Sequence, residues 1–353
     1  MDKKVIAVIS CGKVASEVHF PAFAQMDNIR VKYACDIILQ KAQDIKEKYS
    51  FVEHAITDYK IALADPEVDA VYVLTPNHAH HTVTMDALRA GKHVFCEKPI
   101  AVSYALAEEM AREAEARGKI LDIGVCNRYN KSIEMLEQLN REGRFGSIYH
   151  IYCSFRAFRS IPGLGGAFTT KEKSGGGVLI DWGIHFFDLI FYILGGAKLK
   201  NVTCDAYCEM AKDMKSYKFE RMWASQTANI ETGTNNVEDF ISGYIRTDKA
   251  SISFNGAWAQ NINNDEMFVD FLGDKCGARL YYGEGFELYD GQTLKTKTCE
   301  YEMTDMFLSQ NKAFIQSITT GEKNRNNIRE VLESAKLLDA LYQSAKEGRE
   351  ILL

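Results

Sequence analysis

The N-terminal third of the chain alternates apolar runs with helix-like stretches. Residues 5–9 form an apolar, largely β-branched run without polar alternation, which is typical of a strand buried on both faces. Further strands are predicted at 31–35, 70–74, 93–96 and 120–124, and helices at 14–25, 39–49, 79–90 and 103–117. Because strand and helix alternate strictly, residues 1–125 are predicted to form a doubly wound α/β domain with a parallel sheet.

The remainder of the chain has a different pattern. After a helix at 131–142 come short β-branched or aromatic runs, many of them alternating polar and apolar residues, at 148–155, 202–208, 240–246, 250–256, 266–272 and 278–282. Thr247-Asp248-Lys249 between two of these runs is typical of a hairpin loop. Residues 126–353 are therefore predicted to form an α+β domain with a large open, mainly antiparallel sheet. One face of that sheet is expected to be free, and a free apolar face is often an oligomer interface.

Two further segments complete this description. Residues 326–347 have the clearest helical period, and the C-terminal helices can pack back on the first domain. Residues 210–238 are polar and are predicted to form a long loop.

Composition excludes several classes of protein. A chain of 353 residues with 46% hydrophobic and 25% charged residues is globular and long enough for two domains. Its net charge is -6 and it has no basic run, so nucleic acid is not expected as a partner. The nine cysteines are odd in number and include no CxxC pair, which indicates buried thiols rather than disulfides or a metal site.

The apolar segment 177–197 is long enough to span a bilayer. It contains Asp181, His185 and Asp188, spaced by four and three, so on a helix these side chains share one face. Because carboxylates in hydrocarbon are costly, we expect a buried helix with one wet side and no membrane contact. The N-terminal apolar run is too short for a secretory signal, which favours a cytoplasmic protein.

A dinucleotide motif is expected between the first strand and the first helix. Ser10-Cys11-Gly12-Lys13-Val14-Ala15 is a degraded form of G-x-G-x-x-[GA], in which serine occupies the first glycine position. Gly12 allows a close approach to pyrophosphate, and the helix N-terminus favours its negative charge. Serine in the first position requires a turn that a residue other than glycine can adopt.

The second strand ends at Asp36, which follows Gly12 by 24 residues. An acidic side chain there accepts the ribose hydroxyls of NAD and repels the 2′-phosphate of NADP, and Ile37 and Ile38 offer no compensating cation. A turn or N-cap aspartate is the alternative interpretation. Thr75-Pro76-Asn77-His78 closes what is predicted as the third parallel strand, at the end where this architecture contacts its cofactor.

Three residues are candidates for chemistry. Lys98, in Glu97-Lys98-Pro99, follows another strand and would project toward the cofactor, unless it is an ordinary surface lysine. Asp181 and His185 are four residues apart, so on a helix the carboxylate could orient an imidazole that takes a proton from a hydroxyl. Ser174-Gly175-Gly176-Gly177 before them permits a sharp turn or a close approach to a ligand. The alternative for His185 is a core histidine.

These motifs together resemble the glucose-fructose oxidoreductase, inositol dehydrogenase and MocA (Gfo/Idh/MocA) family. The segments that carry the resemblance occur in order as Cys11-Gly12-Lys13-Val14-Ala15, Thr75-Pro76-Asn77-His78-Ala79-His80, Ala90-Gly91-Lys92-His93-Val94, Glu97-Lys98-Pro99 and Gly175-Gly176-Gly177-Val178-Leu179-Ile180-Asp181-Trp182-Gly183-Ile184-His185. The resemblance extends from about Val5 to the C-terminal helices. It implies a Rossmann domain, a second α/β domain with an open sheet, and pairing through that sheet into dimers, tetramers or larger homo-oligomers.

The resemblance also implies roles for individual residues. Lys98 matches the lysine that contacts the substrate hydroxyl, and Asp181 and His185 match the catalytic aspartate and histidine. The residues expected to bind NAD are Ser10, Gly12, Lys13, Val14, Asp36, Thr75, Pro76, Asn77, His80, Glu97 and Lys98. Those expected to bind substrate, besides the catalytic pair, are Asn127, Arg128, Tyr129, Arg156 and Arg159.

The predicted function is NAD-dependent oxidation of a secondary hydroxyl of a sugar, cyclitol or glycoside, including C3 of a glycoside. The resemblance also allows a redox-neutral mode, in which tightly held NAD is reduced by one sugar and reoxidised by another. Two alternatives remain: an NAD-dependent glycoside hydrolase that acts by transient oxidation and elimination, and a non-catalytic NAD-binding sensor.

Overall fold

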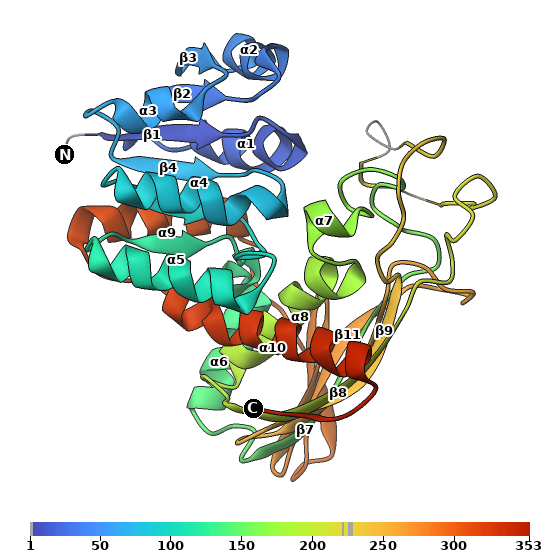
Figure 1. Ribbon diagram of the computed structural model, residues 1–353. Helices are drawn as coiled ribbons and strands as arrows, with labels where there is room; N and C mark the ends of the chain where they lie inside the picture. The colour runs from blue at the N-terminus through green and yellow to red at the C-terminus, as the bar shows by residue number, and fades with distance from the viewer. Residues whose placement is uncertain (1–2, 221, 225–228) are drawn as a thin grey trace. The chain divides into compact units, whose positions relative to one another are not determined.

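The computed structural model describes residues 3–220, 222–224 and 229–353. The chain forms two compact units (Figure 1). The first comprises Met1–Tyr129 and Thr304–Leu332, and the second comprises Asn130–Met303 and Glu333–Leu353. The first unit thus includes a C-terminal segment in addition to the predicted N-terminal domain.

The first unit contains a six-stranded parallel sheet in the order β3-β2-β1-β4-β5-β6. Its strands are β1 (Lys4–Ile9), β2 (Ile29–Cys35), β3 (Val52–Ile56), β4 (Ala70–Val73), β5 (His93–Cys96) and β6 (Leu121–Ile123). This is the doubly wound order of dinucleotide-binding folds, and it confirms the predicted fold class of the first domain. Tyr72 and Phe95 lie side by side in register on β4 and β5, and their rings face Phe314 of α9.

The helices of this unit lie on the two faces of the sheet. Figure 1 shows α4 and α5 side by side, and α4 packs against β4 and β5. The helices are the π-helical turn η1 (Ala15–His19), α1 (Phe20–Phe23), α2 (Leu39–Lys48), α3 (Tyr59–Ala64), α4 (Asn77–Arg89), α5 (Tyr104–Ala116), the 3-10 turn η2 (Cys126–Tyr129) and α9 (Met306–Thr320). As predicted, Ser103 caps α5, its hydroxyl accepting from the Leu106 amide at 3.4 Å.

Three elements of this unit were not predicted, namely β3, α3 and the 3-10 turn η2. The edge strand β3 has the sequence VEHAI, of which only Val52 is buried, so it lacks the apolar run of a central strand. The short helix α3 follows it. Because β3 precedes it, the strand before Thr75 is the fourth along the chain, and its assignment as the third was wrong.

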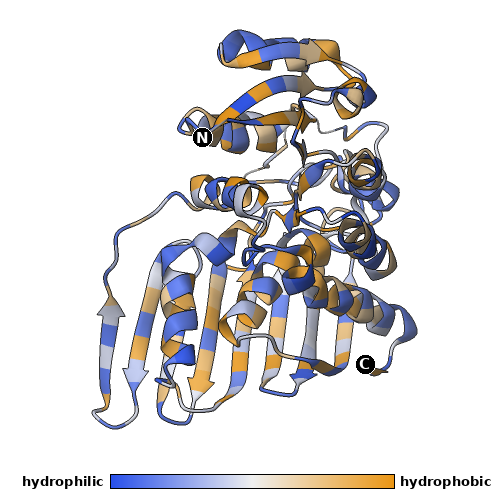
Figure 2. Cartoon of the chain, turned by 90° about the vertical axis from the view of Figure 1, so that its left-hand side faces the viewer, coloured by the Kyte–Doolittle hydropathy of each residue, from blue (hydrophilic) through white to orange (hydrophobic). Residues whose placement is uncertain are grey.

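The second unit contains a nine-stranded sheet in the order β14-β13-β12-β11-β7-β10-β9-β8-β15. Strands β7 and β10 pair in parallel and the other neighbours pair antiparallel, which confirms the predicted open, mainly antiparallel sheet. Its strands are β7 (Ile148–Arg156), β8 (Leu199–Tyr207), β9 (Phe240–Thr247), β10 (Ser251–Ala257), β11 (Glu266–Gly273), β12 (Cys276–Tyr281), β13 (Gly285–Asp290), β14 (Lys295–Cys299) and β15 (Ile351–Leu352). Hydrophobic and hydrophilic residues alternate along many of them (Figure 2), so one face supplies the core.

The last three strands, β13, β14 and β15, were not predicted. Strand β14 reads KTKTC and is largely exposed, which suits an edge protected by lysines but gives no apolar signal. The helices of this unit are α6 (Lys131–Arg141), α7 (Lys171–Ser174), the π-helical turn η3 (Leu179–Gly183) and α8 (Ile184–Ile193), while α10 (Ile328–Glu347) begins in the first unit and continues into the second.

Three predictions concern the remaining segments. The described part of 210–238 has neither helix nor strand, and residues 221 and 225–228 of this predicted loop lie outside the described residues. The cysteines are free, and all are buried except Cys208 and Cys299, which are partly exposed. Lys171–Ile193 is long and apolar enough to cross a membrane by length and composition, but 78% of its most apolar window is buried, as in a core helix.

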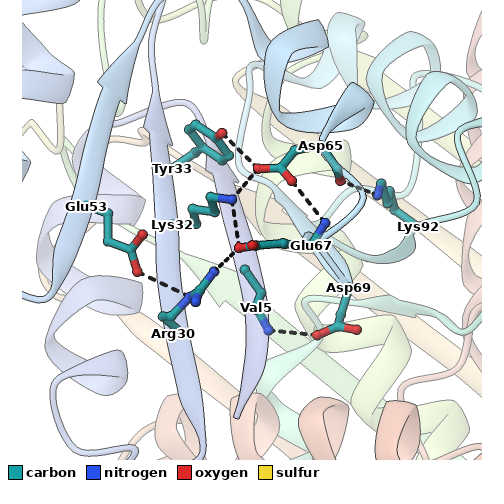
Figure 3. A network of polar contacts seen from close by, with 9 residues as sticks. All are labelled: Val5, Arg30, Lys32, Tyr33, Glu53, Asp65, Glu67, Asp69 and Lys92. Atoms are coloured by element: carbon teal, nitrogen blue, oxygen red, sulfur yellow. Dashed lines mark hydrogen bonds and ion pairs between the residues drawn. The ribbon is translucent and has the colours of Figure 1, made fainter. Parts of the chain in front are cut away.

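A network of charged side chains ties the loop before β4 to β2 (Figure 3). Lys32 donates to Glu67 at 2.8 Å and also pairs with Asp65, and the Tyr33 hydroxyl donates to Asp65 at 2.8 Å. Arg30 joins Glu67 to Glu53 on β3. The hydrogen bond from Lys32 is the main reason why the pKa of Asp65 falls to about 2. The ionised carboxylate is therefore favoured by folding.

This shift predicts an acid-sensitive contribution to stability. Because the folded state depresses the pKa of Asp65 from 3.8 to about 2, its stabilising effect is present above pH 4 and is lost as the pH falls toward 2. We expect Asp65→Asn to lower the melting temperature by a few degrees at pH 7, since one partly exposed pair contributes little. Denaturant unfolding at pH 7, 5 and 3 measures the free energy of unfolding of the variant and of the wild type. The difference between the two proteins should shrink at pH 3. A difference that stays constant with pH would show that the charge is not responsible.

Candidate active site

The loop after β1 has the shape that the dinucleotide motif requires, although it lacks the first glycine. Ser10 adopts a φ of 81°, in the left-handed region that glycine normally occupies. The expectation that the backbone at Ser10 adopts a turn suited to residues other than glycine was therefore wrong. The Ser10 amide donates to the Cys35 carbonyl at 2.7 Å, and the Cys11 amide donates to the Asp36 carboxylate at 2.9 Å. These two bonds to the end of β2 hold the strained loop in place.

The strain predicts that Ser10→Gly stabilises the protein. A left-handed backbone costs an L-residue roughly 1–2 kcal/mol, which glycine avoids. The greater conformational freedom of glycine in the unfolded chain offsets part of this stabilisation. We expect the free energy of unfolding to rise by about 0.5–1 kcal/mol in Ser10→Gly. Ser10→Ala keeps the positive φ and is the matched control, which should not be stabilised. Equal free energies of unfolding of the two variants, measured in urea, would mean that the backbone at Ser10 is not strained.

The residues around this loop fit NAD. A Cβ on Gly12 would find its nearest atom, the Ser10 hydroxyl oxygen, at 3.6 Å, so the backbone is open to a close ligand, and the η1 helix begins three residues later. The Thr75 hydroxyl oxygen at the end of β4 is buried and has no hydrogen-bond partner among the described residues. Asp36 also accepts from the Ile38 amide at 2.9 Å, and each carboxylate oxygen retains a lone pair for a ribose hydroxyl. Ile37 is 90% exposed beside it.

Other residues predicted to bind the cofactor differ in exposure. Lys13 is exposed and pairs with Glu17 at 3.1 Å, while Val14 and Asn77 are partly exposed and Pro76 is exposed. His80 is buried between two carbonyl oxygens, that of Pro99 at 2.7 Å and that of Thr75 at 2.8 Å. Burial lowers the pKa of His80. Its ring braces the ends of β4 and β5, and a direct cofactor contact stays a prediction.

A largely buried pair of side chains supports the turn that bears Lys98. His19, the last residue of η1, contacts Glu97 through Nε2 at 2.9 Å, inside a cage formed by the rings of Phe23, Tyr72 and Phe95. The other oxygen of Glu97 accepts from the Lys98 amide at 3.1 Å.

Gly124 is needed beside this pair. A Cβ at Gly124 would lie 2.7 Å from Glu97 Oε1, so any side chain there would displace the carboxylate. The Lys98 backbone is thus positioned by two residues, His19 and Glu97. The sequence did not indicate His19, whose only signal was a histidine among apolar residues after the glycine motif.

Asp181 and His185 lie where the predicted helix is not buried. Asp181 belongs to η3 and His185 to the first turn of α8. From Gly176 to Phe191 every residue is buried except Asp181, Trp182 and His185. Asp188 was expected on the same wet face, but it is 1% exposed and accepts from the Ser334 hydroxyl at 3.2 Å. Asp188 therefore belongs to the buried side of α8, although His185 on the same helix is partly exposed.

Comparison with known proteins decides the family. Residues 4–125 match the model described as oxidoreductase family, NAD-binding Rossmann fold, and residues 138–353 match that of the same family's C-terminal alpha/beta domain. The chain belongs to the Gfo/Idh/MocA oxidoreductase family. It is an enzyme, an NAD-dependent oxidoreductase acting on CH–OH groups, which sets aside the sensor alternative.

Two relatives that match most of the chain of this family member are named as dehydrogenases. It is 31% identical to D-glucoside 3-dehydrogenase of Escherichia coli over 348 residues, which cover 99% of this chain and 97% of that protein. It is 24% identical to myo-inositol 2-dehydrogenase of Thermotoga maritima, over 90% of this chain and 89% of that one. Among solved structures, levoglucosan dehydrogenase in complex with NADH and levoglucosan has a TM-score of 0.85 at 17% identity, covering 99% of both chains.

The residues predicted for the site of this Gfo/Idh/MocA protein are divided between the two units. The first brings Ser10, Gly12, Asp36, Thr75 and Lys98 to loops at the carboxyl ends of β1, β2, β4 and β5. The second holds Asp181 and His185 on η3 and α8.

The residues predicted to begin the second domain lie in the first unit instead. Asn127, Arg128 and Tyr129 form η2, and all three are buried. The Arg128 guanidinium donates to the carbonyls of Arg325 and Glu330, so it holds the segment around the start of α10. A substrate contact for these three residues stays a prediction.

Two arginines of the second unit remain candidates for substrate binding. Arg156, at the end of β7, pairs with Glu266 on the adjacent β11. Arg159 donates to the Gln260 carbonyl at 3.0 Å and lies 5.0 Å over the ring of Phe158. Both are partly exposed.

Proposed function

We propose that this enzyme oxidises the C3 hydroxyl of a D-glucoside, with His185 as the base, Asp181 as its orienting carboxylate and Lys98 as the group that polarises the substrate oxygen. The observation that carries the proposal is the exposure pattern of η3 and α8. From Gly176 to Phe191 this apolar helix is buried except at a carboxylate, an imidazole and one tryptophan, so this stretch presents acid-base groups to a ligand and little else.

Each residue has a defined task in this mechanism. His185 takes the hydroxyl proton as the C–H bond breaks, and Asp181 stabilises the resulting imidazolium. Lys98 donates to the same oxygen and stabilises the negative charge that develops on it. Bound NAD supplies the acceptor for the hydride. His19 and Glu97 hold the Lys98 backbone in position.

The substrate class rests on the relatives. The E. coli protein that matches nearly the whole chain is named as a D-glucoside 3-dehydrogenase, and several others, among them the Thermotoga maritima protein, are named as inositol 2-dehydrogenases. We therefore assign a glycoside first and a cyclitol second. Arg156 and Arg159 are proposed to contact the sugar hydroxyls, in keeping with their partial exposure.

Product analysis tests this assignment against glycoside hydrolysis. The enzyme is incubated with NAD and methyl β-D-glucoside, and the products are identified by NMR. We expect a 3-keto-glycoside with its methyl aglycone attached, together with reduced nicotinamide in equal amount. Free methanol without a keto-sugar would instead support oxidation followed by elimination. Cofactor that stays bound through purification and cycles between two sugars would support the redox-neutral mode.

We also propose that the chain forms a homo-oligomer through the outer face of the nine-stranded sheet. Tyr152 on β7 and Tyr289 on β13 are 49% and 39% exposed, and Tyr244 and Phe268 on β9 and β11 are partly exposed. Aromatic residues on a sheet face are typical of an interface. Light scattering should give a dimer or larger particle, and Tyr152→Glu should lower its mass. A monomeric wild type contradicts this proposal.

A further inference from the structure

One glutamate closes the beginning of the helix that bears the proposed acid-base pair. Glu238, two residues before β9, is buried, and its Oε1 accepts from the amides of Gly177 at 2.9 Å and Leu179 at 3.1 Å. Its main-chain carbonyl accepts from the Val178 amide at 3.0 Å. Three consecutive backbone donors at the start of η3 therefore bind a single residue. These are amides that a helix leaves without internal partners.

Tyr342 of α10 holds this glutamate. The Tyr342 hydroxyl donates to the same Glu238 Oε1 at 2.8 Å. Burial raises the pKa of Glu238, while its bonds to Tyr342 and to the two amides oppose that rise. Burial and the neighbouring carboxyl also raise the pKa of Tyr342. The pair is thus a fixed hydrogen-bonded unit within the second unit of the chain.

The glycines before the helix are explained by this pair. A Cβ on Gly176 would lie 1.9 Å from the Tyr342 hydroxyl oxygen, and one on Gly177 would lie 1.9 Å from the Glu238 carbonyl oxygen. Neither glycine has a positive φ, so the need for glycine here is space and not backbone conformation. The motif that the sequence offered as a close approach to a ligand is a close approach to Glu238 and Tyr342.

We infer that Glu238, braced by Tyr342, is a positioning residue for Asp181 and His185. The Asp181 amide donates to the Gly177 carbonyl at 3.1 Å, so Asp181 lies one turn beyond the first of the capped residues, and His185 follows four residues later. Loss of the cap would allow this first turn to shift, and displacement of a catalytic group by about 1 Å costs on the order of a hundredfold in rate. This inference rests on the proposed roles of Asp181 and His185.

The test compares two substitutions of Glu238 in the full chain, assayed with NAD and methyl β-D-glucoside. Glu238→Met removes the acceptor while preserving side-chain length, and we expect kcat to fall by about 10- to 100-fold. The KM for NAD should be unchanged, because the residues that fit NAD belong to the other unit. Glu238→Gln retains an oxygen that the two amides and the tyrosine can reach, so it should keep kcat within about threefold.

Asp239 provides the matched control. It is the next residue and is also buried, and its carboxylate likewise accepts from two amides, those of Glu209 at 2.9 Å and Met210 at 2.7 Å, but these lie after β8 and not on η3. Asp239→Leu should lower the melting temperature about as much as Glu238→Met yet leave kcat unchanged. An equal loss of kcat in both variants would reduce Glu238 to a structural role and overturn the inference.

Two further variants keep the result interpretable. If Glu238→Met does not fold, Tyr342→Phe carries the test, with an expected loss of about three- to tenfold in kcat at constant KM for NAD, since one of three bonds to the carboxylate is removed. An unchanged kcat in Tyr342→Phe would then overturn the inference. His185→Asn separates it from the proposed function: full turnover in that variant refutes the function, whereas an inactive His185→Asn beside a fully active Glu238→Met refutes only the positioning role.

Discussion

Lys98→Met is expected to lower kcat by about 10²–10³-fold, the usual effect of removing one donor to a developing oxyanion. Methionine keeps the length of the side chain but cannot donate to the substrate oxygen. The hydrogen bond to the Glu97 carboxylate comes from the backbone amide of Lys98 and not from its side chain. The turn should therefore persist in the variant, and the melting temperature should change little. Steady-state rates with methyl β-D-glucoside, read from the absorbance of reduced nicotinamide, measure the loss.

Lys312→Met serves as the control for this variant. Lys312 is an exposed lysine on α9 of the same unit, and its loss should leave the rate unchanged. If Lys98→Met retained a rate within about threefold of the wild type, Lys98 would not be part of the chemistry, since even one oxyanion donor contributes far more.

His185→Asn is expected to have the larger effect, about 10²–10⁴-fold in kcat, because it removes the base itself. Asparagine is smaller and polar, and position 185 is partly exposed, so folding should be retained. Asp181→Asn should cost less, since the imidazole remains but loses the charge that orients it.

The double variant distinguishes a working pair from two independent residues. If Asp181 acts through His185, the Asp181→Asn/His185→Asn variant should be no slower than His185→Asn alone. Losses that multiply would mean that Asp181 has a separate task. Circular dichroism and the melting temperature of all three variants verify that the comparison is made on folded protein.

The fold could be predicted where burial leaves a clear pattern. The run at β1 is apolar throughout because the strand is covered on both faces, and the strands of the second sheet alternate because one face is covered. The edge strands β3 and β14 have little buried surface, so their sequences carry no such pattern. Their existence depends on the neighbours to which they pair.

The candidate site could be predicted only in part. Local motifs indicated the three residues proposed for the chemistry. Lys98 follows the end of a strand, and Asp181 and His185 follow a run of glycines and are four residues apart. The residues that hold them come from remote parts of the chain: Glu238 is 61 positions from Gly177, and Glu97 is 78 from His19. Spacing along the sequence contains no information on such contacts. The burial of Asp188, which accepts from the Ser334 hydroxyl, depends likewise on three-dimensional packing.

Transfer of a labelled hydrogen tests the proposed reaction most directly. Methyl β-D-glucoside carrying deuterium at C3 is incubated with the enzyme and NAD, and the reduced cofactor is analysed by mass spectrometry. We expect one deuterium per reduced nicotinamide and a ketone at C3 of the sugar, because the hydride leaves that carbon directly. Reduced nicotinamide without deuterium, or no reduction although NAD binds, would contradict oxidation at C3 of a glucoside.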